Sequence, residues 1–197
     1  MADDPVREDI AFIRQTLEEG RSYARLRSPD FAVWGGLVTL GYLGVYGRNI
    51  GLWSLDLNWI WWPLVVMGWL FSTRSFVRRS ETRQKPGPQA RALGALWLGL
   101  GITLMLLGLM QAIVDVHFEW MDLMVFSLLA VCFFATATII GVSWLRWIAA
   151  GWWLAAVVAF LFRDTPEMAL VGAVFMFALL CLPGLVLWLR APSTPHD

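Results

Sequence analysis

Long runs without a single charged side chain constrain this sequence more than any other feature. Most of them match the roughly 17 to 25 apolar residues that a helix needs to cross a bilayer. The six runs cover residues 31–47, 57–73, 92–114, 123–142, 147–162 and 168–189. A charge at mid-bilayer costs about 3 kcal/mol on insertion scales, so each run suits hydrocarbon. The sequence therefore predicts an all-α integral membrane protein with six transmembrane helices arranged as three hairpins.

The composition supports the same class. Only 15% of the residues are charged, against roughly 25% in an ordinary soluble domain. Hydrophobic residues make up 58% of the chain, which is also rich in tryptophan, with 13 residues. Indole rings prefer the boundary between lipid and water, because the ring is apolar and its N–H needs a wet partner. We therefore expect the lipid bilayer to be the main partner of this chain.

The distribution of positive charge predicts an orientation. With the N-terminus in the cytoplasm, the inside segments hold all Lys and Arg residues except Arg48 and Arg163. This asymmetry is typical of short cytoplasmic loops. We expect a multi-pass protein of a bacterial-type plasma membrane, the inner membrane, with both termini cytoplasmic. Residues 1–28 would form a cytoplasmic amphipathic helix and anchor, 29–190 the six-helix bundle, and 191–197 a short cytoplasmic tail.

The N-terminal segment resembles a separate docking element. Within residues 5–19, apolar side chains form one stripe, Phe12 points elsewhere, and acids outnumber bases, unlike the Lys- and Arg-rich helices that bind lipid surfaces. We predict that this helix lies over the basic 73–91 loop of its own chain or of a second copy; the alternative is that it rests on the bilayer. The candidate interaction residues are Ile10, Phe12, Ile13, Leu17, Glu18, Glu19, Arg78, Arg79 and Arg83.

The turn of the second expected hairpin gathers ionisable side chains on the outer face. The stretch DVHFEWMD contains Asp115, His117, Glu119 and Asp122. Alternating residues of an extended loop point to one side, and carboxylate and imidazole groups bind cations or protons. The simpler interpretation is a polar turn between two spans. The stretch is therefore a candidate ion or proton site, with no second histidine to complete a metal centre.

Small side chains suggest how the last two spans pack. Span five carries one strip of small residues at intervals of four, and span six carries another. Such strips let helix backbones approach closely in lipid. The sequence predicts face-to-face packing of the two spans through Gly151, Ala155, Ala159, Ala169, Gly172 and Ala173. Pro183, followed by Gly184, is expected to loosen the inner third of span six.

The sequence contains no recognisable catalytic motif. The six runs hold no ionisable side chain of the Asp, Glu, Lys, Arg or His types, and no phosphate-binding loop occurs. We predict no catalytic residue, cofactor, metal or nucleic-acid partner. The leading interpretation is a non-enzymatic structural or regulatory protein that binds a second copy, or a membrane or cytoplasmic protein, through its cytoplasmic face. The alternatives are a permease-like transport subunit or small transporter acting as an oligomer, and an outer-face proton or cation sensor.

Overall fold

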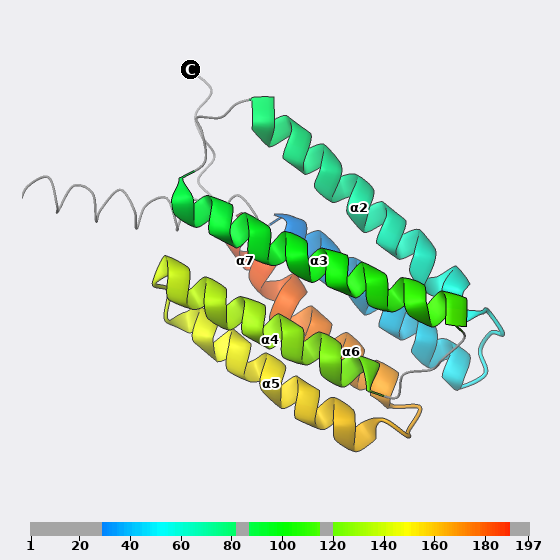
Figure 1. Ribbon diagram of the computed structural model, residues 1–197. Helices are drawn as coiled ribbons and strands as arrows, with labels where there is room; N and C mark the ends of the chain where they lie inside the picture. Colours follow the sequence, from blue (N-terminus) through cyan, green and yellow to red (C-terminus); the bar gives the residue numbers. More distant parts are fainter. Residues whose placement is uncertain (1–28, 82–86, 115–119, 190–197) are drawn as a thin grey trace, which may run out of the picture.

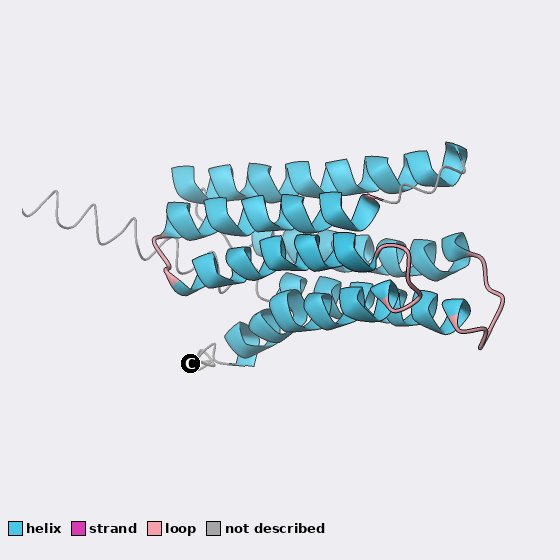
Figure 2. Cartoon of the chain, turned by 90° about the horizontal axis from the view of Figure 1, so that it is seen from below, coloured by secondary structure: helices cyan, strands magenta, loops and turns pink. Residues whose placement is uncertain are grey.

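The uncharged runs form helices in the computed structural model, which describes residues 29–81, 87–114 and 120–189. The helices lie side by side along one common direction, with α2 and α5 at opposite edges (Figures 1 and 2). The described residues include no strand. The elements are a helix over 29–49, α2 (Leu57–Glu81), α3 (Pro88–Val114), α4 (Met121–Ile140), α5 (Trp144–Phe162), α6 (Met168–Met176), the π-helical turn η1 (Phe177–Cys181) and α7 (Leu182–Leu189).

Four helical stretches in the described part of the chain are long and apolar enough to cross a membrane. They are Pro88–Ile113, Met121–Ile140, Trp144–Phe162 and Met168–Leu189, the last of which joins α6, η1 and α7 into one continuous helix. Their apolar side chains are compatible with the hydrocarbon core of a bilayer. Their backbone N–H and C=O groups form hydrogen bonds within the helix, as a bilayer requires. The regular structure of the described residues is therefore entirely helical, and the chain has the character of a multi-pass membrane protein.

The fourth span is shifted toward the N-terminus of its predicted range. Helix α4 begins at Met121 rather than at residue 123, so Asp122 belongs to its first turn. The helix ends at Gly141, whose φ of 67° lies in the left-handed region and whose N–H donates to the carbonyl of Ala137. A side chain would strain that conformation. Residues 141–142, predicted as part of the span, instead form a tight turn into α5.

Among α2 to α7, the most extensive contact is between α4 and α5, which belong to two different expected hairpins. Alanines on both helices are fully buried, among them Ala130 of α4 and Ala149 of α5. Small side chains allow the two backbones to approach closely, which gives dispersion contacts that lipid cannot match. The rings of Phe126 and Trp152, 5.4 Å apart, fill the space beside them.

The helix over 29–49 and α2 interlock through tryptophans set over glycines. A Cβ atom at Gly41 would lie 2.5 Å from the Trp61 ring of α2, and one at Gly68 of α2 would lie 2.7 Å from the Trp34 ring. Each glycine therefore provides a hollow that takes an indole from the other helix. The Trp34 indole also donates a 2.9 Å hydrogen bond to the hydroxyl of Ser72.

The same first helix meets the last one by direct backbone contact. A Cβ at Gly184 would lie 2.5 Å from the backbone nitrogen of Ala32, and one at Gly35 would lie 2.6 Å from Cα of Cys181. The last helix is irregular at this crossing: the N–H of Leu182 donates to the carbonyl of Phe177, five residues earlier. Pro183 has no N–H to continue the α-helical pattern. The irregular turn thus lies just before Pro183, in the middle of the run, whereas the inner third that was predicted to loosen is the α-helix α7.

Candidate functional site

The N-terminal end of α4 places an ionisable side chain inside the bundle. Asp122 lies in the first turn of α4, half-buried, and its Oδ1 accepts a hydrogen bond from the hydroxyl of Tyr42. Tyr42 belongs to the helix over 29–49 and is 7% exposed. An acid in the first turn is favoured there by the positive end of the helix dipole. The contact joins two helices whose residues are 80 positions apart in the sequence.

The ring of Tyr42 packs against residues of α2, α4 and α6. Its ring packs edge-on against Trp61 of α2, with 5.4 Å between ring centroids, and tilts against Phe126 of α4 at 6.4 Å. On α6, Gly172 faces the ring so closely that a Cβ there would lie 2.6 Å from Cε1 of Tyr42. The phenol is therefore fixed on several sides, and its hydroxyl is directed to Asp122.

No positive side chain neutralises this carboxyl within the part of the chain that the structure describes. The nearby turn between α5 and α6 has its own ion pair, in which Arg163 lies 3.3 Å from the carboxylate of Asp164. The same guanidinium stands 4.5 Å from the centre of the Phe160 ring. Tyr42 is thus the polar partner that the described residues offer to Asp122, and the pair is a neutral or singly charged unit.

Only one member of the predicted outer-face site is described. Asp115, His117 and Glu119 lie outside the described residues, so the cation site that includes them stays a prediction. Over residues 29–81, 87–114 and 120–189, no group of three or more His, Cys, Asp or Glu side chains could hold a metal ion. Asp122 was expected on the outer surface beside the loop. The structure places it in the first turn of α4, half-buried rather than in an open loop; that this end of the helix faces outward stays a prediction.

Sequence reasoning did not select Tyr42. A tyrosine within an uncharged run resembles an interfacial anchor, and nothing local connects it with an acid 80 residues away. Asp30 was also overlooked: it is 7% exposed at the start of the helix over 29–49, one position before the first uncharged run. The available signal for Asp122 was its place at a helix start, where acids are common.

The predicted packing strips are largely buried, although their partners are more varied than the sequence suggested. Helices α5 and α6 touch, but α5 packs more extensively on α4. Gly151 faces Leu179 of η1, and Gly172 faces Tyr42. The buried alanines of the strips are Ala155, Ala159, Ala169 and Ala173. Their residue-by-residue pairing between the last two spans stays a prediction.

The candidate cytoplasmic interaction surface falls outside the described residues, apart from the backbone of Arg78 and Arg79 near the end of α2. Its docking on the 73–91 loop is therefore still a prediction from the sequence.

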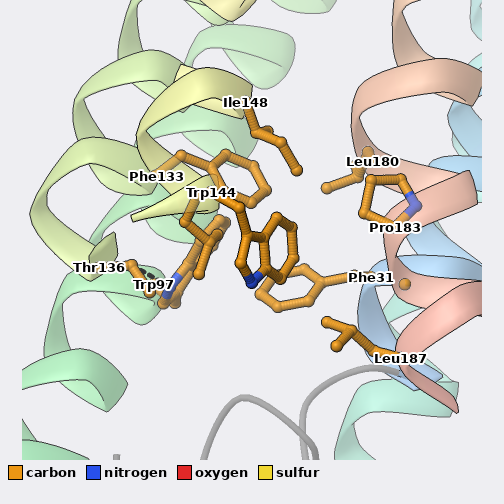
Figure 3. Close-up of a pocket in the computed structure, with 11 residues that line it drawn as sticks. Phe31, Trp97, Phe133, Thr136, Trp144, Ile148, Leu180, Pro183 and Leu187 are labelled. Atoms are coloured by element: carbon orange, nitrogen blue, oxygen red, sulfur yellow. Dashed lines mark hydrogen bonds between the residues drawn. The ribbon is translucent and has the colours of Figure 1, made fainter. Parts of the chain in front are cut away.

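A second feature is an apolar pocket near the opposite end of the bundle (Figure 3). The last helix lines one side, and α3, α4 and α5 line the other. The Phe31 ring packs against Trp97 and Phe133, with ring centroids 4.8 Å and 5.8 Å apart. The polar side chains between them are already engaged: the Trp97 indole donates to the Thr136 hydroxyl at 3.1 Å, and that hydroxyl donates to the carbonyl of Cys132 at 2.7 Å.

The function of these features is inferred from the geometry of the chain itself. No protein-family model, no curated protein and no solved structure matches this sequence.

Proposed function

We propose that this chain is a six-span protein of a bacterial-type plasma membrane, threaded as three hairpins with both termini in the cytoplasm. Four apolar helices support the membrane class. The helix over 29–49 and α2 run alongside them (Figure 1) and include the uncharged runs 31–47 and 57–73. Glycine and tryptophan lower the hydropathy of these two runs without adding charge. The excess of Lys and Arg on one side sets the orientation.

Within that membrane, the protein acts as a regulatory protein that responds to protons at its outer end. The observation that carries this proposal is the hydrogen bond from Tyr42 to Asp122 inside the bundle. An ionisable side chain among membrane helices is costly and usually marks a functional site with a specific partner. Changing the charge on Asp122 changes what the Tyr42 hydroxyl binds, and so changes the force between two helices.

The helix that contains Tyr42 also connects the contact with Asp122 to the segment expected in the cytoplasm. Its inner end continues directly into residues 1–28, the segment predicted to dock on the basic 73–91 loop or on a partner protein. A change at the outer contact would therefore act on the element expected to bind the partner. In this mechanism, a proton response at Tyr42 and Asp122 changes partner binding by residues 1–28, because the helix over 29–49 connects the two.

The polar side chains of the helices favour this function over transport. The hydroxyls of Thr39, Thr103 and Thr138 each donate to the carbonyl four residues earlier in the same helix. Such bonds satisfy the hydroxyl locally and leave few groups to line a path for a polar substrate. A permease-like oligomer would need to build that path between copies of the chain.

The pH dependence of stability tests the proposal. In lipid nanodiscs, the melting temperature of the wild-type protein should change across the range in which carboxylic acids titrate. Asp122→Asn keeps an oxygen that accepts from Tyr42 but removes the titration, so part of that change should disappear. Asp164→Asn removes an exposed carboxylate of the outer turn and is the matched control. Superimposable profiles for the wild type and Asp122→Asn would refute the proton response.

A further inference from the structure

The irregular turn of the last helix leaves one backbone acceptor without its helical donors. In η1 the N–H of Leu182 donates to the carbonyl of Phe177, so it does not serve the carbonyl of Ala178, four residues before it. The donor in the π-helical pattern would be residue 183, which is a proline and has no N–H. The carbonyl of Ala178 therefore has no partner at either of the two positions that a helix provides.

This carbonyl lies on the exposed side of the helix, at mid-depth in the membrane. A helical carbonyl points along the axis toward the residue four positions later; Ala178 is exposed, and Leu182 is 46% exposed. Ala178 is ten residues after Met168 and eleven before Leu189, about 15 Å from either end of the span. Water and headgroups do not reach the centre of a hydrocarbon core about 30 Å thick, and an unpaired backbone group is costly there.

Helix α5 provides a matching donor. Trp153 lies nine residues from both ends of α5, about 14 Å from each, and is 43% exposed. Its ring packs against Phe134 of α4, with centroids 5.7 Å apart, and its indole N–H donates to no atom of residues 29–81, 87–114 and 120–189. Indole favours the membrane boundary, where water accepts from the N–H. At mid-depth the N–H needs another acceptor.

The donor and the acceptor lie at the same level of the bundle. Gly151 of α5 faces Leu179 of η1, since a Cβ there would lie 3.0 Å from Cδ2 of Leu179. From this contact, Trp153 lies two residues toward the turn between α5 and α6, which is about 3 Å. Ala178 lies one residue toward the same turn, which is about 1.5 Å. The two groups therefore differ in depth by about 1.5 Å.

The two groups cannot pair within one chain. Trp153 comes two residues after Gly151, so it points about 200° away from the face of α5 that meets the last helix, toward Phe134 and α4. Both α4 and the last helix contact α5, which lies at an edge of the bundle (Figures 1 and 2). The donor is therefore on one flank of α5, and the acceptor lies beyond the other.

From this complementarity we infer that a second copy of the chain docks along α5, with Trp153 of each copy donating to the Ala178 carbonyl of the other. A two-fold axis along the membrane normal brings the α4 side of one α5 to the last-helix side of the other copy and keeps depth unchanged. Groups meet across such an axis only at equal depth, as these two do. Acyl chains carry no donor, so lipid cannot satisfy the carbonyl. The inference rests on the membrane class and not on the Tyr42–Asp122 contact.

Dimerisation in lipid vesicles tests the inference. The full chain, with a fluorophore after Asp197, is reconstituted at a series of protein-to-lipid ratios, and energy transfer between labelled copies gives the dissociation constant. Trp153→Phe removes the N–H and keeps a ring. It should raise the dissociation constant about tenfold, because two interhelical hydrogen bonds are lost. Trp147→Phe removes the same group at an 80% exposed position three residues from the start of α5, where interfacial water is the acceptor, and should have no effect.

Restoring the missing donor tests the acceptor. Pro183→Ala allows the last helix to return to the regular pattern, in which Leu182 donates to the Ala178 carbonyl, and should weaken the dimer as much as Trp153→Phe. The double variant should be no weaker than either single one. Trp153→Phe decides alone if Pro183→Ala does not fold.

A photoreactive azidophenylalanine at position 153 locates the contact. In a mixture of isotopically heavy and light chains, cross-links between the two should join position 153 to the exposed neighbours of Ala178, Val174 and Leu182. Cross-links to lipid alone would mean that the bilayer covers this face and would overturn the inference. So would a monomer at every protein-to-lipid ratio, or equal dissociation constants for the wild type and Trp153→Phe.

Discussion

Substituting Gly172 by alanine should disturb the candidate site although both of its polar residues, Tyr42 and Asp122, stay unchanged. The new Cβ would lie 2.6 Å from Cε1 of Tyr42, whereas carbon atoms in contact prefer about 3.5 Å or more. The ring must therefore move by about 1 Å. Trp61 and Phe126 stand on its other sides, with centroids 5.4 Å and 6.4 Å away, so little free space receives it.

The expected cost combines two effects. Overpacking a well-filled interior costs about 1–3 kcal/mol. A displacement of about 1 Å also exceeds the tolerance of an O–H···O hydrogen bond, and loss of such a bond costs about 1 kcal/mol, or more when the partner is charged. We expect Gly172→Ala to lower the free energy of unfolding by about 3 kcal/mol. For a protein of this size that corresponds to roughly 6–12 °C in melting temperature.

The chain provides a matched control in α3. A Cβ at Gly99 or Gly108 would meet nothing within 4 Å, and alanine favours the helix over glycine by about 1 kcal/mol. Gly99→Ala should therefore be neutral or slightly stabilising in the same nanodiscs. Gly172→Ala should also reduce the pH response that Asp122→Asn removes. Equal melting temperatures for Gly172→Ala and Gly99→Ala would refute the placement of Tyr42 against α6.

Two further substitutions test the helix contacts. Gly184→Ala should destabilise the protein by more than Gly172→Ala, because its Cβ would meet the backbone of Ala32 at 2.5 Å and a backbone cannot rotate away as a side chain does; a smaller loss of melting temperature would contradict the crossing. Ala155→Leu introduces bulk at a fully buried position and should cost about 1–3 kcal/mol, whereas Val157→Leu on the exposed face of the same helix should leave the melting temperature unchanged. Comparable losses for the two α5 variants would contradict the burial of Ala155.

The sequence was sufficient for the helices because hydrocarbon imposes simple requirements. A run such as 168–189 offers no charge to solvate, and its backbone must bond internally, so the helix follows almost directly from composition. The end of α4 was not predicted: Gly141 was placed inside the fourth span, whereas its φ of 67°, a left-handed conformation that suits glycine, ends the helix. For the last helix the location was only approximate, because the inner third was expected to loosen and the irregular turn η1 lies just before Pro183, in the middle of the run.

Which helices pack against one another could not be predicted from the sequence in the same way. Gly172 belonged to a convincing strip of small residues, yet its hollow receives Tyr42 and not α5. A glycine marks a place of close approach, while the identity of the approaching group depends on how all the helices are arranged. Asp122 was assigned to a loop because acids usually stay outside spans. At a helix start the dipole and a tyrosine hydroxyl supply what water otherwise supplies.

The helix over 29–49 connects features that look separate along the sequence. Tyr42 binds Asp122 at one level, and seven residues earlier Gly35 meets the last helix. These two positions are about 10 Å apart along the axis and two turns from each other, so they project from the same face. Between them, Thr39 donates to the carbonyl of Gly35 at 2.6 Å, a bond that tends to bend a helix rather than stiffen it. A displacement of Tyr42 therefore reaches the Gly35 crossing either as a shift of the whole helix or as a bend centred near Thr39. Replacing Thr39 by valine removes the bond and keeps the shape, so it separates the two cases: a pH response that survives the change requires the helix to move as one body.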